Sequence, residues 1–452
     1  MIPRVAVVGG GLAGITAALR CADAGCAVTL LESRPRLGGL ASSFRRGALD
    51  VDTGQHVFLR CCTAYRSLLD RLDVTDLVTV QPRLDVPVLA PSLPPARLRR
   101  SGLPAPLHLA GALLRYRPLP VADRLRLVPA ALALRAVSPD DPATDRRSFA
   151  DWLDEHGQGP RAVEVLWDLI GTATLNAPAA SASLALAAMV FRLGLLTDAA
   201  AGDIGWSRVP LGRLHDAAAR QALAAAGVDV RTASRVRTVA PIAGGWRVAL
   251  THRGRAGDVR ADRVVCAVPP VAAARLLPPE RVDLRWSALG SSPIVDVHVV
   301  YDRQVLDTPL AAGVDTSVRW LFDRTAASGL ARCGPPGAQY LAVSISAADD
   351  LIGLPTARIR ELLLPALGAL LPAARRATVL DVFVTREPHA TFRPAPGTAA
   401  LRPPASTDAP DLFLAGAWTD TGWPATMEGA VRSGETAAVL ASAGSAPRGA
   451  AA

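Results

Sequence analysis

Apolar runs and a turn-forming segment alternate in the first thirty residues, in a pattern typical of a βαβ unit. Residues 4–8 (RVAVV) and 27–31 (AVTLL) are continuous apolar runs of strand length, which indicates strands buried on both faces. Between them, apolar positions from Leu12 to Ala24 recur at helical spacing, and Gly25 follows as a C-terminal cap. We therefore predict a strand, a Gly-rich turn, a helix and a second, parallel strand.

Helical and strand-like patterns alternate along the rest of the chain. Residues 92–147 are rich in Pro, Leu, Ala and Arg, and they predict short amphipathic helices with arginine flanks. Residues 148–196 predict further helices, whereas the pattern after Gly227 is that of strands. A mixed segment follows from 295 to 385, with strands around a helix at 356–371. This succession predicts an α/β fold.

Composition narrows the function classes. A chain of 452 residues favours two domains, and its 50% apolar content supplies large cores. The net charge is +9 and every one of the 49 basic residues is arginine, which reflects either a biased genome or a basic face for anionic lipid headgroups. Scattered arginines and only 4% aromatic residues disfavour nucleic acid as a partner. The six cysteines lack metal-ligand or CxxC spacing, so we expect no metal and a reducing cytoplasm.

The turn after the first strand reads Gly9-x-Gly11-x-x-Gly14. A pyrophosphate needs backbone N–H groups at a helix N-terminus with no Cβ in the way, and glycines at these positions provide that. Glu32 closes the second strand eighteen residues after Gly14, where its carboxylate can accept hydrogen bonds from ribose hydroxyls and disfavours a 2′-phosphate. Together these residues predict a dinucleotide site.

Two further segments suggest which dinucleotide. Residues 32–43 read ESRPRLGGLASS and residues 52–56 read DTGQH, which resemble motifs of the amine oxidase and phytoene desaturase superfamily. The resemblance implies FAD, with Arg34 near the diphosphate and Gly38 and Gly39 letting the loop pass beside it. It also places Gln55 and His56 near the isoalloxazine ring. An exposed loop arginine and a core histidine are the alternatives for Arg34 and His56.

Later segments carry the same resemblance. The strand at GVDVRTASRVRTVA resembles the one that lays backbone on the adenine, which points to Val236, although a plain sheet strand is the alternative. The tail DLFLAGAWTDTGWPATMEGAVRSG (411–434) predicts a strand, a turn at Gly416, and a helix whose first N–H groups, near Thr426 and Met427, face the flavin pyrimidine. Ala417 departs from the superfamily, where many members have an aspartate that contacts the ribityl chain.

Candidate proton donors are His56 and Asp420, which we take as candidate catalytic residues because they lie in loops near the expected flavin. Glu428 is a third candidate near the expected ring, but we expect its carboxyl group to cap the first helical turn rather than to act in catalysis.

The motifs together resemble the hydroxysqualene dehydroxylases, also labelled squalene-associated FAD-dependent desaturases. The residues that carry this narrower resemblance are DTGQH, Asn176-Ala177-Pro178, GDIGWSRVPLGRL at 202–214, RWLFDR at 319–324 and the tail. It implies reductive removal of a hydroxyl from hydroxysqualene to give squalene for hopanoid synthesis, an isoprenoid substrate, and an external electron donor for FAD. Residues 92–147 would then form a peripheral membrane face at the inner side of the plasma membrane, with buried core helices as the alternative.

The resemblance also implies a domain organisation. We expect a Rossmann-type FAD-binding domain of residues 1–75, 205–275 and 400–445, with Pro-rich residues 388–404 as the returning linker and a disordered tail at 446–452. A discontinuous substrate domain of mixed sheet and helical insert takes residues 76–204 and 276–399.

Three alternative functions stay open. The first is that the chain acts as a carotenoid-type or phytoene-type desaturase, and the second is that it acts as an amine oxidase. The third is that it is a non-catalytic flavin- and lipid-binding partner in a terpenoid assembly.

Overall fold

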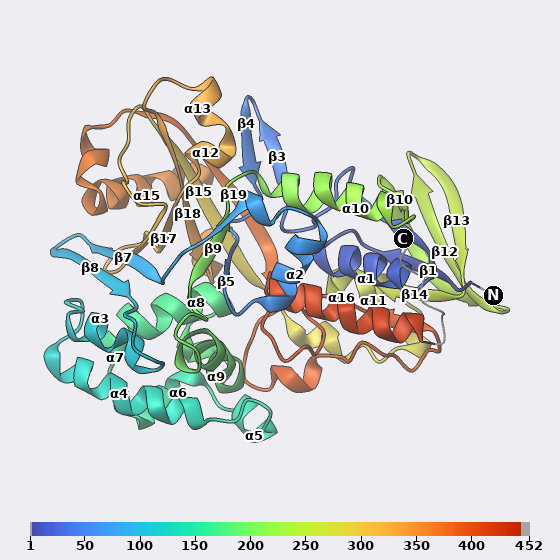
Figure 1. Cartoon of the computed structure of the whole chain (residues 1–452), viewed down its shortest axis with the longest axis horizontal. Coiled ribbons are helices and arrows are strands. Elements are labelled where there is room, and N and C mark those ends of the chain that lie inside the picture. The colour runs from blue at the N-terminus through green and yellow to red at the C-terminus, as the bar shows by residue number, and fades with distance from the viewer. Residues whose placement is uncertain (1, 444–452) are drawn as a thin grey trace.

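A computed structural model describes residues 2–443 and shows two sheet-containing units with a helical insert (Figure 1). The expected tail at 446–452 lies outside the described residues. The first unit contains a five-stranded, all-parallel sheet. Its strands, in spatial order, are β10 (Asp229–Arg231), β2 (Ala27–Leu31), β1 (Arg4–Val8), β14 (Arg263–Cys266) and β20 (Leu412–Leu414). Residues from three distant parts of the chain therefore form one sheet.

Both faces of the parallel sheet are covered, which explains its continuous apolar strands. Val5 and Val7 of β1 pack toward helices, whereas Ala6 and Val8 belong to the core on the opposite face. The helices on the first side are α1 (Leu12–Asp23), α2 (Thr63–Arg71), α10 (Ala219–Ala225) and α16 (Met427–Ser442). On the other side lies an antiparallel meander of β11 (Ser234–Ile242), β12 (Gly245–His252) and β13 (Arg255–Ala261), followed after β14 by α11 (Pro270–Leu276).

The second unit is built on a seven-stranded mixed sheet whose two faces differ. Its strands, in spatial order, are β19 (Val379–Thr391), β15 (Ser292–Tyr301), β18 (Gln339–Ser346), β17 (Trp320–Asp323), β16 (Leu310–Gly313), β7 (Asp85–Ala90) and β8 (Leu93–Arg99). Helix α15 (Thr356–Leu370) packs Ile359 and Leu363 on the odd-numbered valines of β15. The opposite face carries Asp296 and His298 and continues to Val300, which packs with Val51 of the first unit.

Two small sheets lie where the units meet. One is the hairpin of β3 (Ser43–Arg46) and β4 (Leu49–Asp52), and the other has the order β5 (Val57–Leu59), β9 (Ile204–Ser207), β6 (Val78–Val80). The second unit also contains three short helices, which are α12 (Thr325–Ser328), α13 (Leu330–Cys333) and α14 (Asp349–Ile352).

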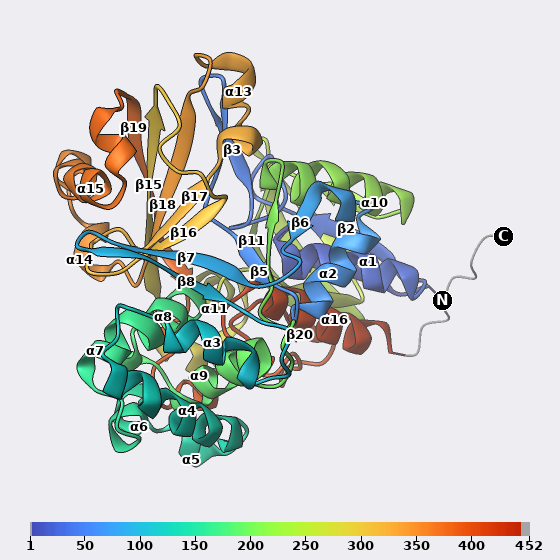
Figure 2. The same cartoon turned by 60° about the vertical axis from the view of Figure 1, so that its left-hand side comes forward.

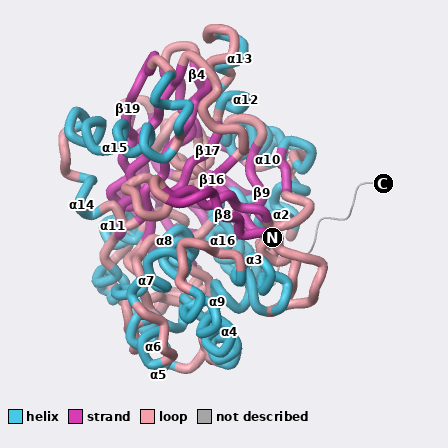
Figure 3. The backbone as a smooth tube through the Cα atoms, turned by 90° about the vertical axis from the view of Figure 1, so that its left-hand side faces the viewer, coloured by secondary structure: helices cyan, strands magenta, loops and turns pink. Residues whose placement is uncertain are grey.

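The helical insert forms the lower layer in Figure 2. Its helices are α3 (Ala110–Leu114), α4 (Val121–Ala136), α5 (Pro142–Asp145), α6 (Phe149–Glu155), α7 (Pro160–Ala162), a π-helical turn η3 (Val163–Trp167), α8 (Asp168–Leu175) and α9 (Leu184–Phe191). Its core is aromatic, with Phe149 in contact with Trp152, Trp167 and Phe191. Figure 3 shows this layer of helices beneath the strands of the seven-stranded sheet. Within residues 2–443 the structure contains no helix of the length and apolarity needed to cross a bilayer.

The α/β expectation is confirmed, and one local prediction is wrong. Residues 93–99 form strand β8 rather than part of a helix, although they contain Pro94 and Pro95. Strand β8 is the edge of its sheet, so among the described residues one side of the strand has no ladder partner. The N–H groups that proline lacks are not needed on that side. The predicted helices of 92–147 begin only after this hairpin.

Candidate functional site

The Gly-rich turn between β1 and α1 leaves open space at the N-terminus of α1. Gly9 has φ +108°, a conformation that favours glycine. A Cβ on Gly14 would lie 1.9 Å from the Gly9 carbonyl oxygen. A glycine at position 14 therefore allows α1 to pack closely against the Gly-rich turn that precedes it. A Cβ on Gly11 would meet only the Cα of Gly39, at 3.9 Å. The chain itself therefore leaves space at Gly11, at the N-terminus of α1, where a pyrophosphate is expected.

Glu32 lies directly at this turn. Its Oε2 accepts a hydrogen bond from the Gly10 N–H at 2.7 Å, and its Oε1 accepts one from the Arg34 N–H, also at 2.7 Å. The Glu32 carboxylate is buried. It is thus fixed beside the Gly-rich turn, which is the geometry that ribose recognition by this residue requires.

The loop after Glu32 runs back across the turn. Gly38 donates its N–H to the Gly10 carbonyl oxygen at 2.8 Å, and both Gly38 and Gly39 have positive φ. A Cβ on Gly39 would lie 3.0 Å from the Cα of Gly11, so these two backbones pass in close contact. The Arg34 side chain is exposed on the same loop.

Strand β11 also adjoins Glu32. The Ser234 N–H donates to the Glu32 carbonyl oxygen at 2.8 Å, and Val236 is a buried residue two positions further along the strand. Contact between Val236 and an adenine ring stays a prediction, but the strand that carries Val236 starts beside Glu32.

The C-terminal motif contributes a second helix N-terminus. The Thr426 hydroxyl accepts a hydrogen bond from the Gly429 N–H at 3.2 Å and caps α16, which begins at Met427. Gly416 has φ +143° and donates its N–H to the Ser433 hydroxyl at 2.8 Å. Because β1 and β20 are parallel, the helices that follow them begin at the same edge of the sheet.

Glu428 does not cap its own helix, contrary to the sequence-based expectation. Its carboxylate accepts hydrogen bonds from the Ala64 N–H at 3.1 Å and the Tyr65 N–H at 2.8 Å, and pairs with Arg432 at 2.7 Å. It is completely buried, at 0% exposure. Glu428 therefore caps the N-terminus of α2 and fastens α2 to α16.

We expect Glu428→Gln to lower the free energy of unfolding by about 2 kcal/mol, because charge-assisted hydrogen bonds to the α2 N-terminus are weakened. The flavin absorbance spectrum and its bleaching by dithionite should stay as in the wild type. Glu435→Gln, two turns further along α16, is the matched control, since Glu435 forms a partly exposed pair with Arg20 and should cost less than about 1 kcal/mol. Unaltered stability in urea with lost turnover would instead assign Glu428 to catalysis.

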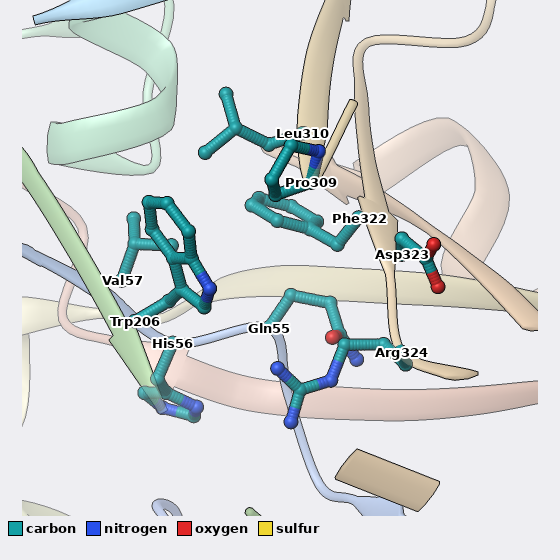
Figure 4. Close-up of a pocket in the computed structure, with 9 residues that line it drawn as sticks. All are labelled: Gln55, His56, Val57, Trp206, Pro309, Leu310, Phe322, Asp323 and Arg324. Atoms are coloured by element: carbon teal, nitrogen blue, oxygen red, sulfur yellow. The ribbon is translucent and has the colours of Figure 1, made fainter. Parts of the chain in front are cut away.

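Gln55 and His56 line a small cavity between the two units (Figure 4). Trp206 of β9, Phe322 of β17 and Arg324 complete much of its wall. The His56 Nδ1 lies 3.1 Å from the Gly54 carbonyl oxygen, and burial lowers the pKa of the ring. His56 therefore lines this cavity, and in its neutral form around neutral pH it is a weak proton donor. Its place beside the flavin ring stays a prediction.

Asp420 lies elsewhere. Its side chain is exposed, while its backbone N–H donates to the Pro403 carbonyl oxygen at 2.8 Å. The structure does not bring Asp420 to the cavity of Gln55 and His56, and a catalytic role for it stays a prediction.

Asp52 and Arg324 form a buried ion pair that the sequence did not reveal. The Arg324 guanidinium pairs with Oδ2 of Asp52, and the two side chains are 12% and 4% exposed. Oδ1 of Asp52 also accepts hydrogen bonds from the Ser43 hydroxyl at 2.6 Å and the Leu211 N–H at 3.0 Å. The pair joins the DTGQH segment of the first unit to the RWLFDR segment of the second, next to His56.

A larger cleft of about 700 Å³ opens between the helical insert and the end of the seven-stranded sheet. Leu169 of α8, Trp320 of β17 and Ser346 of β18 lie on its walls, with Asp154 and Asp350 among its acidic residues. Trp320 and Ser346 belong to the same sheet face as Phe322 of the smaller cavity. One face of the sheet thus borders both spaces.

A parallel sheet with a Gly-rich turn at one helix N-terminus, a buried carboxylate beside that turn and a second helix N-terminus at the same edge is typical of a dinucleotide-binding oxidoreductase. Residues 12–441 match the family described as flavin containing amine oxidoreductase, and the chain belongs to that family.

Similar proteins agree with this assignment. The chain is 31% identical to a hydroxysqualene dehydroxylase of Rhodopseudomonas palustris over 97% of this chain and 98% of the relative. It is 26% identical to a zeta-carotene desaturase of Zea mays over 98% of this chain and 84% of the relative. Among solved structures, a putrescine oxidase aligns with a TM-score of 0.71 at 20% identity, over 97% of this chain and 98% of that one. This last likeness shows the fold.

The cofactor is FAD, and the described residues fit it. The open space at Gly11 would take the pyrophosphate and Glu32 the ribose, while the N-terminus of α16 at Thr426 and Met427 would face the ring system. Ala417 offers no side-chain acceptor to the ribityl chain, and exposed Asp420 is not positioned by any side-chain hydrogen bond among the described residues to replace it.

Proposed function

We propose that this protein catalyses the FAD-dependent reductive dehydroxylation of hydroxysqualene to squalene. The observation that carries the proposal is the 31% identity to a hydroxysqualene dehydroxylase, which extends over nearly the full length of both chains. Two further relatives with the same name, from Sinorhizobium fredii and Zymomonas mobilis, are 27% and 26% identical. The motifs DTGQH and RWLFDR support it, because the structure joins them through Asp52 and Arg324.

The chemistry suits the two spaces that border the sheet. Loss of the allylic hydroxyl as water requires a proton and leaves a delocalised cation, so nucleophiles and bulk water must be kept away. Phe322, Leu310 and Trp206 give the inner cavity an apolar wall, and the larger cleft offers room for a long hydrocarbon. Bound FAD, reduced by an external electron donor, supplies the hydride.

The test has two stages. An absorbance spectrum of the purified protein should show a flavin that dithionite bleaches and air restores. Incubation of the reduced protein with hydroxysqualene should then yield squalene, identified by gas chromatography. A flavin-containing protein that produces no squalene would overturn the proposed substrate, and a colourless protein that still binds liposomes would favour a non-catalytic binding partner.

Oxidative desaturation is the second candidate, favoured by the 26% identity to zeta-carotene desaturases. In that reaction the flavin begins oxidised and the polyene precursor loses hydride. Assaying the air-oxidised protein with zeta-carotene or phytoene, in parallel with the reduced protein and hydroxysqualene, separates the two directions.

We further propose that the outer surface of α3 and α4 docks on the inner face of the plasma membrane. This docking face contains Leu114 of α3, Val121, Leu125 and Val128 of α4, and Leu107 of the 3₁₀ turn that precedes α3, and these side chains are between 51% and 66% exposed. Exposed arginines flank these side chains, namely Arg115, Arg117 and Arg135. An apolar surface bordered by cations fits an anionic bilayer, from which a hydrocarbon substrate would enter.

We expect the double variant Val121→Asp/Leu125→Asp to bind vesicles of phosphatidylglycerol and phosphatidylcholine at least about tenfold more weakly than the wild type, because two apolar side chains leave the bilayer. Val439→Asp on α16, which changes a 70% exposed valine elsewhere, is the matched control and should bind as the wild type does. Co-sedimentation with vesicles measures both. Equal binding by the double variant and the wild type would exclude this surface as the docking face.

A further inference from the structure

Asp296 is a buried carboxyl group that forms no ion pair with any of residues 2–443. It lies in the middle of β15 with 2% of its surface exposed, and its Oδ1 has no hydrogen-bond partner within residues 2–443. Unpaired carboxylates are costly to bury, so a carboxyl in this environment tends to keep its proton. The nearest buried ion pair does not neutralise it, because Arg324 is already paired with Asp52.

The surroundings of Asp296 lie on the functional side of the sheet. Asp296 shares the face opposite α15 with His298, and its neighbour in register on β18 is Ser344. Ser344 is half-buried and stands directly opposite Trp320 of β17, which lines the large cleft. Ser346, one alternate position along β18, lines the same cleft. In the register of the sheet, Ser344 therefore lies between Asp296 and Trp320, which is a wall residue of the cleft proposed for substrate.

Other titratable groups near Asp296 are not available as acids. The Tyr340 hydroxyl lies 2.7 Å from Nδ1 of His298, and Nε2 of His298 lies 2.9 Å from the Thr385 hydroxyl. Burial lowers the pKa of His298 to about 3 and raises that of Tyr340, so both are neutral at pH 7. The charged groups around this set are Asp52, Arg324 and Arg46.

The protonation state agrees with this placement. Burial, opposed by the hydrogen bond of Ser344 and reinforced by the negative charge of Asp52, raises the pKa of Asp296 to about 7. A carboxyl group with such a pKa holds its proton in slightly acidic solution and releases it readily near neutrality, as a general acid must.

We propose that Asp296 is the proton source for the leaving hydroxyl, and that the Ser344 hydroxyl passes the proton to the substrate. This inference rests on the proposed dehydroxylation. The C–O bond breaks with its electron pair on oxygen, the oxygen takes the proton and leaves as water, and the carbon receives a hydride drawn from reduced flavin. One proton and one hydride are consumed for each water released. Asp296 and Ser344 are therefore the acid and its relay.

The test uses the flavin-loaded Asp296→Asn and Ser344→Ala variants, with Ser287→Ala, at an exposed serine that is not among the wall residues of either space, as the control. With dithionite-reduced protein and hydroxysqualene, we expect squalene formation to fall about 100-fold or more in Asp296→Asn and about tenfold in Ser344→Ala. Ser287→Ala should stay within about twofold of the wild type, as other surface changes away from a functional site do. Wild-type activity should decline as the pH rises through about 7, and this decline should be absent from the residual activity of Asp296→Asn.

A second measurement does not depend on turnover. Infrared difference spectra between pH 5.5 and 8.5, on protein without substrate, should show a carboxylic-acid C=O band that is lost at high pH and is absent in Asp296→Asn. The assignment of Asp296 as the proton source would be overturned if the wild type lacked that band, or if Asp296→Asn were as active as an active wild type. If the wild type itself forms no squalene, the proposed function is wrong, and so is the proposed proton transfer to the hydroxyl of hydroxysqualene. The infrared band would still show whether Asp296 is protonated in the folded protein.

Discussion

Gly11→Ala is expected to give a folded protein that purifies without its flavin. The backbone at Gly11 has φ −74°, which alanine adopts freely, and the added Cβ would meet only the Cα of Gly39 at 3.9 Å. The methyl group would instead occupy the space where the pyrophosphate approaches the N-terminus of α1. An overlap costing about 3 kcal/mol lowers FAD affinity about 100-fold.

The measurements are the ratio of flavin to protein absorbance and the melting temperature of flavin-free protein. Gly11→Ala should lose the flavin while its flavin-free melting temperature matches that of the flavin-free wild type. Gly14→Ala should damage the fold itself, because its Cβ would lie 1.9 Å from the Gly9 carbonyl oxygen. Gly257→Ala on β13, where a Cβ meets nothing within 4 Å, is the control that should keep its flavin. If Gly11→Ala purified with a full complement of flavin, the pyrophosphate would not bind at this turn.

Local sequence signals were sufficient to predict β1, β2 and the Gly-rich turn between β1 and α1. Strands β1 and β2 occupy the residues predicted for them, because strands buried on both faces leave continuous apolar runs. The glycine positions follow from backbone geometry within one turn, and Glu32 ends a strand adjacent to that turn. These relations are short-range in sequence, so spacing alone identifies them.

The parts that escaped prediction depend on contacts between distant segments. Glu428 caps α2 across 364 positions of sequence, and no local pattern near it indicates this partner. Asp296 sits in a strand of alternating pattern, where a polar residue would ordinarily face solvent, and only the packing of the second unit buries it. Strand β8 was mistaken for helix because its two prolines obscured an edge strand.

Arg324→Met is expected to lower the free energy of unfolding by about 3–5 kcal/mol, since it leaves the buried Asp52 carboxylate without its cation. The two hydrogen bonds from Ser43 and Leu211 remain, but they do not neutralise the charge. Urea unfolding of flavin-free protein measures the loss. Arg358→Met, which breaks an exposed pair with Glu361 on α15, is the control and should cost less than about 1 kcal/mol.

The double variant Asp52→Asn/Arg324→Met separates charge from packing. With no charge left buried, it should recover most of the stability that Arg324→Met loses. Because Asp52 is the last residue of the β3–β4 hairpin and Arg324 follows β17 of the second unit, the pair also fixes the two units against each other beside His56. Arg324→Met should therefore unfold with two separate transitions where the wild type shows one. A single transition at wild-type stability would show that the ion pair is dispensable for joining them.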